Sequence, residues 1–582
     1  MSVRAKLKVA QVAAKLISQV VAMEASEGTL LATASKSIKA GRLMLARDKT
    51  FAEMLEQKAV RNGDRVFLVY GDRQITYRQM NETSNRLAHR LIEAGIKPGE
   101  GVGVLMTNSP EFLFAFYGAQ KAGCFAVPIN TGLKGDGLEY VINHSEIATL
   151  FVDKGLLDNL LPLRPKLNGL RKIVVFDEAD PAAGPTLAFA QSPAPGEDKL
   201  RPCENLRYWL RPGEVDHNPG LALPPDGVSY LMYTSGTTGM PKAVVYRQNN
   251  TGIKQMYAVS RTFFGKDDVF YTPLPLFHAN ALTITTLMAF GADARLVVGK
   301  RFSASRFWND VREHGVTTFN ALGAMIPILL KQPPNALDAQ NNVKLVISSA
   351  CPANLWDEFE SRYGVKLLEA YGAVDGGGFA CFNIGNAPPG SIGKPLSGKY
   401  RIVDESGNDA PVGQPGELIF WVGLKSKGSV EYLKNERATR EKVKDGWLHT
   451  GDQVTADKDG FLYFVGRLTE SMRRRGENVS AYEIETQVNK YPDCLECAAY
   501  GVPSELGEHE IMITLAPVEG RKIDLDDLQK FLAEKLPKYA VPRFVNIVPE
   551  IPKTATHRVM KKELERAGVT PETIDLEKRA SR

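Results

Sequence analysis

Short apolar runs that alternate with helical patterns characterise the chain from residue 50 onward. Runs at 102–106, 126–128 and 149–152 are rich in Val, Leu, Ala and Phe, and helical patterns separate them. This alternation is typical of parallel strands joined by crossover helices. A second alternating block follows and includes an expected strand at 343–347. We therefore predict an α/β fold whose large N-terminal domain combines parallel-rich sheets with helices.

Residues 395–465 show a different pattern, because apolar and polar positions alternate there with a period of two. Turn sequences at 405–407 and 458–460 interrupt the alternation. These features predict antiparallel strands in a small β-rich subdomain. The stretch at 176–227 is rich in Pro, Ala, Asp and Gly, and we expect it to be a long surface connection.

The length of the chain bears on its domain organisation. A chain of 582 residues is longer than one hydrophobic core normally supports, so at least two domains are expected. We predict a basic amphipathic leader at 1–49, a large domain at 50–466 and a small mobile α+β domain at 467–582. The last of these contains an apolar run at 498–502 that is typical of a strand.

The leader has a helical periodicity of its own. On a helical wheel, a narrow polar stripe opposes a surface of Val, Ala, Leu and Ile, and the stripe consists of Arg4, Lys8, Gln11, Lys15 and Gln19. Three interpretations stay open for residues 1–23: a helix on an anionic bilayer, a helix docked on the protein's own surface, and an organellar presequence. No uninterrupted apolar run reaches the roughly 18 residues of a membrane span. We predict a cytoplasmic protein, with peripheral contact at the inner face of a membrane as one option.

Composition and charge exclude some function classes. The net charge of +5 is small for this length and gives no reason to predict nucleic-acid binding. The six cysteines are scattered, which suits a reducing compartment. The CxxC at 494–497 lacks the second pair of a zinc site, so we expect the cysteines to pack in or near the core. The oligomeric state is not predicted.

The stretch Tyr233-Thr-Ser-Gly-Thr-Thr-Gly-Met-Pro-Lys242 carries the strongest chemical signal in the chain. Its glycines let backbone N–H groups approach an oxyanion, its hydroxyls donate hydrogen bonds, and its lysine supplies positive charge. It follows the apolar run at 228–232 directly. The stretch therefore predicts a phosphate-binding loop. It is not a Walker A loop, because Gly239 is followed by Met-Pro-Lys.

This loop resembles the phosphate loop of the adenylate-forming superfamily, which includes acyl-CoA synthetases, luciferases and peptide-synthetase adenylation domains. Further motifs of that superfamily follow in the same order. Leu-Pro-Leu-Phe-His ends at His278, Tyr-Gly-Ala-Val-Asp at Asp375, Trp-Leu-His-Thr-Gly-Asp at Asp452 and Gly-Arg at Arg467. Gly-Glu-Asn-Val at 476–479 matches the start of the mobile C-terminal domain. The order and spacing agree over roughly residues 50–565.

The resemblance implies a reaction in two steps. A carboxylate attacks the α-phosphate of ATP to give an acyl-adenylate and pyrophosphate, and the thiol of coenzyme A then displaces AMP. The cofactors implied are ATP and Mg²⁺, with coenzyme A as co-substrate. The residues implied to hold the β- and γ-phosphates are Thr234, Ser235, Gly236, Thr237, Thr238, Gly239 and Lys242.

Other parts of the nucleotide are assigned by the same resemblance. His278 is placed near the acyl carboxylate, Asp452 at the ribose hydroxyls and Arg467 at the ribose or phosphate. The adenine site is assigned to Ser349, Ala350, Cys351, Tyr371 and Gly372. Arg474 and Gly476 lie in a basic stretch for which two interpretations stay open, contact with the phosphates of coenzyme A and a solvated charged face.

Three positions depart from the superfamily pattern. Val374 stands where the motif has Thr, and Asp375 stands where it has the Mg²⁺-binding Glu. Arg558 occupies the position of the lysine that bridges the carboxylate and the α-phosphate. Three interpretations stay open: Arg558 itself supplies the bridging cation, a neighbouring lysine supplies it, or the protein has lost adenylation. The neighbouring lysines are Lys553, Lys561 and Lys562.

Within the superfamily, the segments at 302–308 and 355–359 look like those of two groups. One contains bacterial long-chain acyl-CoA synthetases of the fatty acid transport protein type, and the other contains crotonobetaine/carnitine-CoA ligases. We predict an AMP-forming acyl-CoA synthetase for a medium- or long-chain fatty acid. The alternatives are a crotonobetaine/carnitine-type ligase and a catalytically degenerate acyl or nucleotide binder.

Overall fold

The computed structural model describes most of the chain beyond residue 48. The described residues are 49–178, 186–187, 203–213, 215–221, 224, 226–234, 241–248, 256–257, 260–261, 263–322, 325–376, 378–383, 387–395, 399–423, 430–468, 471–474, 477–503, 509–536, 540–554 and 559–580. The predicted helix at 1–23, the loop residues 235–240, Gly476 and Arg558 lie outside them.

The chain divides into two compact units. Unit 1 comprises residues 1–398 and 422–446, and unit 2 comprises residues 399–421 and 447–582. The strands of 400–421 and 447–467 thus group with the C-terminal segment. The predicted domain boundary between 466 and 467 stays a prediction.

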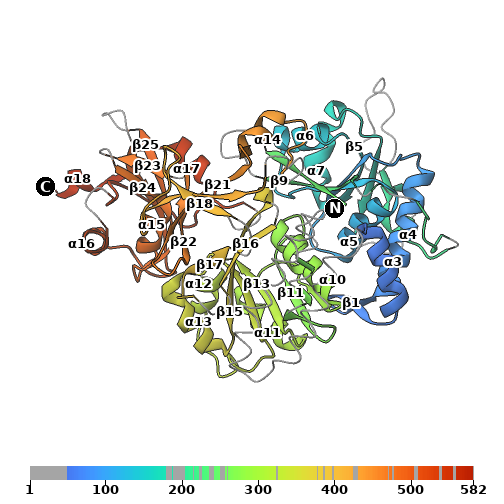
Figure 1. The fold of residues 1–582 in the computed structure, drawn as a ribbon, viewed down its shortest axis with the longest axis horizontal. Coiled ribbons are helices and arrows are strands. Elements are labelled where there is room, and N and C mark those ends of the chain that lie inside the picture. The colour runs from blue at the N-terminus through green and yellow to red at the C-terminus, as the bar shows by residue number, and fades with distance from the viewer. Residues whose placement is uncertain are drawn as a thin grey trace. The chain divides into compact units, whose positions relative to one another are not determined.

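One sheet of unit 1 has the strand order β10-β9-β4-β3-β5-β6-β8-β7. Figure 1 labels two of its strands, β5 and β9. Strand β3 pairs in parallel with both β4 and β5, as the apolar runs predicted. The strand bounds are β3 Gly101–Leu105, β4 Phe125–Pro128, β5 Ile147–Asp153, β6 Lys172–Phe176, β7 Thr186–Leu187, β8 Cys203–Asn205, β9 Val228–Thr234 and β10 Lys242–Arg247.

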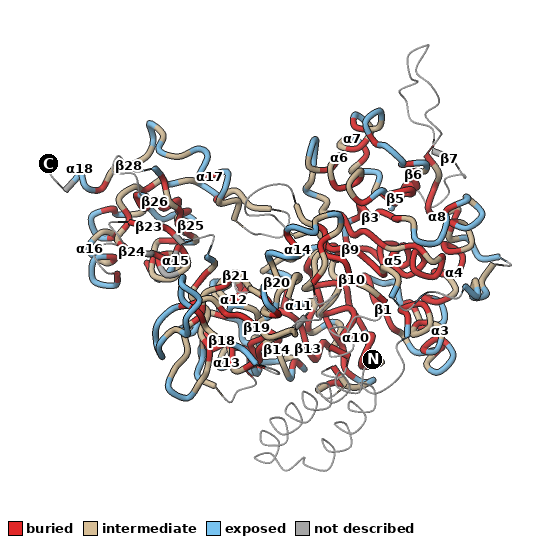
Figure 2. Tube along the Cα trace, turned by 45° about the horizontal axis from the view of Figure 1, so that its top comes forward, coloured by how far each residue is buried: buried red, intermediate tan, exposed pale blue. Residues whose placement is uncertain are grey.

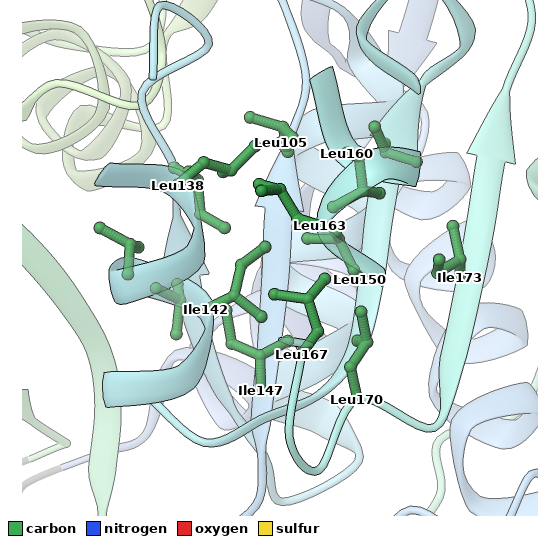
Figure 3. Packing of buried hydrophobic residues seen from close by; sticks show 14 of the residues in the cluster. Leu105, Leu138, Ile142, Ile147, Leu150, Leu160, Leu163, Leu167, Leu170 and Ile173 are labelled. Carbon is green, nitrogen blue, oxygen red and sulfur yellow. The ribbon is translucent and has the colours of Figure 1, made fainter. Parts of the chain in front are cut away.

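A hydrophobic cluster covers one face of this sheet. Leu105 and Leu150 come from strands β3 and β5, and Ile142 comes from helix α6 (Gly135–His144). Figure 3 shows these side chains converging with Leu163 of the 3-10 helix η2 (Leu161–Lys166). The cluster therefore anchors the helices that follow β4 and β5 to the sheet that carries β9 and β10.

A second sheet supplies the rest of unit 1, in the order β17-β16-β15-β14-β13-β11-β12-β1-β2. Its central strands β12, β11, β13, β14 and β15 run parallel to one another. The strand bounds are β1 Val66–Tyr70, β2 Arg73–Thr76, β11 Val269–Thr272, β12 Arg295–Val298, β13 Thr318–Leu322, β14 Leu345–Ser349, β15 Leu367–Ala373, β16 Gly378–Asn383 and β17 Ser391–Pro395. The strand expected at 343–347 is β14, which begins two residues later.

Local sequence signals explain where several helices of unit 1 begin. Thr50 forms a capping box with Glu53 at the start of α3, and Ser109 accepts from the Phe112 N–H at the start of α5. The helix bounds are α3 Phe51–Asn62, α4 Tyr77–Glu93, α5 Pro110–Lys121, α7 Leu157–Leu160, α8 Leu206–Trp209, α10 Leu287–Ala292, α11 Ala304–Glu313, α12 Met325–Leu330, α13 Trp356–Tyr363 and α14 Glu436–Lys442.

The expectation of a surface connection over 176–227 is wrong for its middle part. Strand β8 pairs in parallel with β6, and the short helix α8 buries Leu206 and Trp209. Composition misled the prediction because a strand of three residues and a single helical turn with two buried apolar side chains fit within a stretch that is otherwise polar.

Unit 2 contains the predicted antiparallel strands. Strand β19 pairs with β18 and β21, and β21 pairs with β22, all antiparallel. A second sheet has the order β25-β26-β27-β28, and β23 pairs with β24. The strand bounds are β18 Tyr400–Val403, β19 Gly416–Trp421, β21 Trp447–Ala456, β22 Leu462–Arg467, β23 Ser471–Arg474, β24 Glu477–Ser480, β25 Cys494–Pro503, β26 His509–Pro517, β27 Phe544–Ile547 and β28 Ile574–Asp575. The helices are α15 Ala481–Val488, α16 Leu525–Lys535, α17 Lys561–Ala567 and α18 Leu576–Ala580.

The predicted burial of the cysteines is confirmed. All six thiols are free and buried, and Cys494 and Cys497 belong to the core beneath β25 and β26. Figure 2 shows that buried residues concentrate along the strands of both units. Among the described residues, no helix has the length and apolar character needed to cross a bilayer.

Candidate active site

The parallel strands of the second sheet bring three predicted motifs of unit 1 to one edge. His278 follows β11, Ser349 ends β14 with Ala350 and Cys351 directly after it, and Tyr371 lies near the end of β15. Because the carboxyl ends of parallel strands share an edge, this edge is where α/β sheets bind ligands. The structure thus brings residues predicted to lie near the acid and the adenine to one edge of the sheet, although they lie far apart in the sequence.

The phosphate loop connects two antiparallel strands, β9 and β10. Thr234 stands opposite Lys242 in the register of the pair, and its hydroxyl lies 3.4 Å from the Lys242 carbonyl oxygen. This pairing holds together the two ends of the loop whose residues 235–240 lie outside the described part of the chain. The predicted cradle therefore has rigid strand ends on both sides.

A compact polar cluster surrounds Asp375. The Tyr432 hydroxyl donates to the Asp375 carboxylate at 2.6 Å, and the Lys442 ammonium lies 3.0 Å from the same oxygen, Oδ2. Lys242 Nζ lies 5.5 Å from the centroid of the Tyr432 ring, a cation–π distance. Tyr432 thus connects the phosphate loop to the predicted metal ligand. Burial and the neighbouring Asp375 raise the pKa of the Tyr432 hydroxyl, so it stays a proton donor.

The fit of Asp375 to Mg²⁺ depends on the nucleotide. In the described part of the chain, no group of three or more His, Cys, Asp or Glu side chains could hold a metal ion by itself. Mg²⁺ commonly takes one or two protein carboxylates and completes its shell with water and substrate phosphates. Asp375 beside the phosphate loop suits an ion of that kind, and Lys442 balances its charge when no cation is bound.

The turn after β14 is held by a buried glutamate, Glu369. Its carboxylate accepts the N–H groups of Ala350 and Cys351, the second at 3.2 Å. Ser349 donates through its hydroxyl to the carbonyl oxygen of Ala370 at 3.3 Å. Tyr371 is half-buried and Gly372 is exposed at the end of the same strand. Burial raises the pKa of Glu369 to about 7.

The raised pKa predicts a pH dependence of stability. Between the ordinary value of 4.5 and about 7, folded Glu369 binds a proton that the unfolded chain releases. The free energy of unfolding should therefore fall as the pH rises through this window, by up to about 3 kcal/mol. Urea midpoints of the wild type and E369Q between pH 5 and pH 8 measure the effect. Identical pH slopes for the two proteins would contradict it.

The loop that carries His278 is fixed by Asn108. The Asn108 amide donates to the Leu274 carbonyl oxygen at 2.9 Å and accepts the Leu276 N–H at 2.8 Å. The His278 N–H donates to Pro275 at 3.0 Å, which closes the turn. A π-helix at Asn280–Thr286 follows, a rare element that is frequent at functional sites.

Two predicted ribose residues lie side by side in unit 2. Asp452 and Arg467 are partners in the β21–β22 register, and Arg467 Nε lies 3.6 Å from Asp452 Oδ1. Glu417 on β19 supports the motif, because its carboxylate accepts from the Gly451 N–H at 2.9 Å and contacts His449 Nδ1 at 2.7 Å. Gly451 has a φ of +78°, a conformation that favours glycine.

Two family models match the chain. The model described as AMP-binding enzyme covers residues 55–423, and the model described as AMP-binding enzyme C-terminal domain covers residues 483–558. The chain belongs to the AMP-binding enzyme family. The predicted superfamily and fold class are thereby confirmed.

Several relatives of this AMP-binding enzyme are CoA ligases. The crotonobetaine/carnitine–CoA ligase of Salmonella typhi is 28% identical over 88% of the chain and 98% of the relative. An anthranilate CoA ligase in complex with anthranoyl-AMP shares the fold, with a TM-score of 0.76, 24% identity and coverage of 89% and 97% of the two chains. A Mycobacterium tuberculosis fatty acyl CoA synthetase has a TM-score of 0.64, 24% identity and coverage of 90% and 99%.

The family models and the curated relatives support an AMP-forming ligase that joins an acid to coenzyme A. ATP, Mg²⁺ and coenzyme A, the predicted cofactors and co-substrate, are those that AMP-binding CoA ligases use. The individual site residues stay predictions.

Arg474 differs from the other predicted contacts of this AMP-binding enzyme. Its guanidinium is buried and lies 2.6 Å from the Glu510 carboxylate, and it donates to the Val541 carbonyl oxygen at 2.6 Å. Neither interpretation of the basic stretch anticipated this internal ion pair. We propose a structural role for Arg474 in the core of unit 2, whereas Gly476 stays a predicted coenzyme A contact outside the described residues.

Sequence reasoning missed the residues that support the site. These are Asn108, Glu369, Glu417, Tyr432 and Lys442. Each acts on a motif that lies elsewhere in the chain. Glu369 offered a signal in the sequence, since a glutamate inside the apolar run of a buried strand requires hydrogen-bond partners.

Proposed function

We propose that this protein is an AMP-forming acyl-CoA synthetase that activates a medium- or long-chain fatty acid. The observation that carries the nucleotide half is the cluster of Lys242, Tyr432 and Asp375 beside the paired ends of the phosphate loop. It offers positive charge and a metal-binding carboxylate within one small volume, as a triphosphate with Mg²⁺ requires. Because the chain belongs to a family of AMP-binding enzymes, the triphosphate that fits this cluster is ATP.

The first step needs positioning and charge neutralisation more than covalent chemistry by the protein. Lys242 and the loop hold the terminal phosphates, and Asp375 holds the ion that accompanies them. Asp452 accepts from the ribose hydroxyls, and Arg467 adds a cation beside it. In the second step the thiol of coenzyme A attacks the acyl carbonyl and AMP leaves.

The cation at the α-phosphate is proposed to be Arg558. Lys553 Nζ lies 2.6 Å from the Glu496 carboxylate, and Lys561 Nζ lies 2.8 Å from that of Glu485. Both ion pairs belong to unit 2 and engage two of the three lysines that could substitute. Their engagement supports Arg558, which occupies the position of the motif itself.

An apolar acyl chain is supported by the segment that contains His278. From Val269 to Ala292 the chain has no Asp, Glu, Lys or Arg. A nearby carboxylate would favour a substrate with a quaternary ammonium group, and this segment supplies none. A hydrocarbon chain needs no such charge, and burying it against an uncharged segment is favourable.

A crotonobetaine- or carnitine-type acid is the second candidate. It is favoured by the curated relatives, which carry that activity in their names at 28% identity. The two candidates predict different acids in the same assay.

ATP–pyrophosphate exchange with a panel of acids tests the proposal. The panel contains octanoate, palmitate, benzoate, crotonobetaine and carnitine, each with Mg²⁺. We expect exchange with octanoate or palmitate and little with the others. Exchange with crotonobetaine alone would replace the first candidate by the second, and no exchange with any acid would favour the degenerate binder.

We also propose that residues 1–23 contact anionic membranes, as their amphipathic pattern indicates. Deleting them is expected to leave ligase activity in solution unchanged and to reduce sedimentation with anionic vesicles. Vesicles of neutral lipid are the control. Undiminished sedimentation of the truncated protein would contradict the proposal, and loss of folding would favour a helix docked on the protein surface.

A further inference from the structure

The turn after β14 combines an unusual backbone with a buried acid. Ala350 has a φ of +68°, in the left-handed region that residues other than glycine seldom adopt. Glu369 is 2% exposed, and its two carboxylate oxygens accept from two successive N–H groups, those of Ala350 and Cys351. A buried carboxylate and a left-handed alanine are each unfavourable alone, and the two hydrogen bonds offset part of both costs.

This turn lies beside the strand that carries Tyr371, which the resemblance assigns to the adenine site. Ser348 on β14 is the parallel partner of Glu369 on β15. Tyr371 follows Glu369 by two residues, so both side chains lie on one face of the strand. The position of the turn relative to Tyr371 therefore depends on how Glu369 holds it.

We propose that Glu369 is a positioning residue for the nucleotide, which holds the turn at Ser349-Ala350-Cys351 at the distance from Tyr371 that an adenine ring requires. The inference rests on the proposed function, because it assumes that these residues bind the base. It assigns no contact between Glu369 and ATP. Glu369 acts through the backbone of its neighbours.

Only a carboxylate on a side chain as long as that of glutamate can accept both N–H groups of the turn. The two N–H donors need two acceptor oxygens, and each oxygen of Glu369 serves one of them. Glutamine offers a single oxygen, and its NH₂ group would face the second N–H donor. Aspartate is one methylene shorter. E369Q therefore leaves one buried donor unsatisfied and releases a turn that is strained at Ala350.

E369Q and a matched control test the proposal in the full-length protein. The control is E360Q, because the Glu360 carboxylate also accepts a backbone N–H of β15, that of Leu367 at 2.7 Å, at the opposite end of the strand. Titration calorimetry at pH 8, above the pKa of about 7 for Glu369, measures the affinity for ATP, AMP and GTP, and rapid quench at the same pH measures adenylation at saturating ATP. We expect E369Q to weaken ATP and AMP binding about tenfold, with reduced preference for ATP over GTP. E360Q should stay within about twofold of the wild type in affinity, since its hydrogen bond lies away from the turn.

A second substitution separates positioning from general stability. Introducing A350G into E369Q removes the left-handed strain, so the double variant should bind ATP more tightly than E369Q. Wild-type affinity in E369Q, or no recovery in the double variant, would overturn the inference. If E369Q does not fold, A350V replaces it, because a β-branched residue at positive φ opposes the turn while Glu369 stays intact. Unchanged ATP affinity in A350V would then overturn the inference.

The outcome also distinguishes this inference from the proposed function. If the wild type binds neither ATP nor AMP, the proposed function fails. If the wild type binds both and E369Q binds them equally well, only the role of Glu369 fails.

Discussion

Arg558→Ala is expected to slow acyl-adenylate formation by at least about a hundredfold. The transition state carries negative charge on the attacking carboxylate and on the α-phosphoryl oxygens. A cation between them is worth several kcal/mol in a closed site. With alanine at this position, the two negative charges repel each other and no side chain neutralises them. Pre-steady-state release of pyrophosphate measures this step alone. Arg558→Lys should retain substantial activity, because it restores the charge without the planar fork of the guanidinium.

The lysine alternatives make the opposite forecast. If Lys553, Lys561 or Lys562 supplied the charge, its alanine variant would be the severe one and Arg558→Ala would be mild. The ion pairs of Lys553 with Glu496 and of Lys561 with Glu485 favour Arg558. Thioester formation from supplied acyl-adenylate is the internal control, since a residue that acts only in adenylation should leave it nearly unchanged. Equal losses in both steps would indicate damage to unit 2.

Asp452→Ala is expected to abolish detectable adenylation and to leave the fold intact. The carboxylate is proposed to accept two hydrogen bonds from the ribose, each worth about 1.5–3 kcal/mol because the acceptor is charged. Their loss corresponds to at least about a hundredfold in nucleotide binding. The substitution also leaves Arg467 without the carboxylate that lies 3.6 Å away. ATP–pyrophosphate exchange measures the loss of adenylation, and direct titration with ATP measures the loss of nucleotide affinity.

The matched control for Asp452 is Asp459→Ala. Asp459 is exposed in the turn between β21 and β22, the same pair of strands that carries Asp452 and Arg467. Its substitution should preserve exchange, which would exclude a general effect on these strands. ATP turnover of Asp452→Ala within about threefold of wild type would contradict the ribose assignment.

Local patterns were sufficient for much of the fold. The apolar runs at 102–106, 126–128 and 149–152 became parallel neighbours, and the period-two stretch at 395–465 became antiparallel strands. These features depend on residues close together in the chain, where periodicity and turn chemistry act directly. The prediction for 176–227 was wrong in its middle part, because whether a strand of three residues joins a sheet depends on partner strands elsewhere in the chain.

The sequence by itself determined the family and the order of its motifs, since each motif is a short run of residues whose chemistry is legible in isolation. Tertiary structure alone decided what holds those motifs in place. Asn108 fixes the loop before His278, Glu417 supports Gly451, and Tyr432 and Lys442 hold Asp375. Each contact joins elements that are far apart in the sequence, so the spacing of residues along the chain cannot predict it. Such contacts arise when packing against two sheets brings polar groups together, and burial then requires that each of them be hydrogen-bonded.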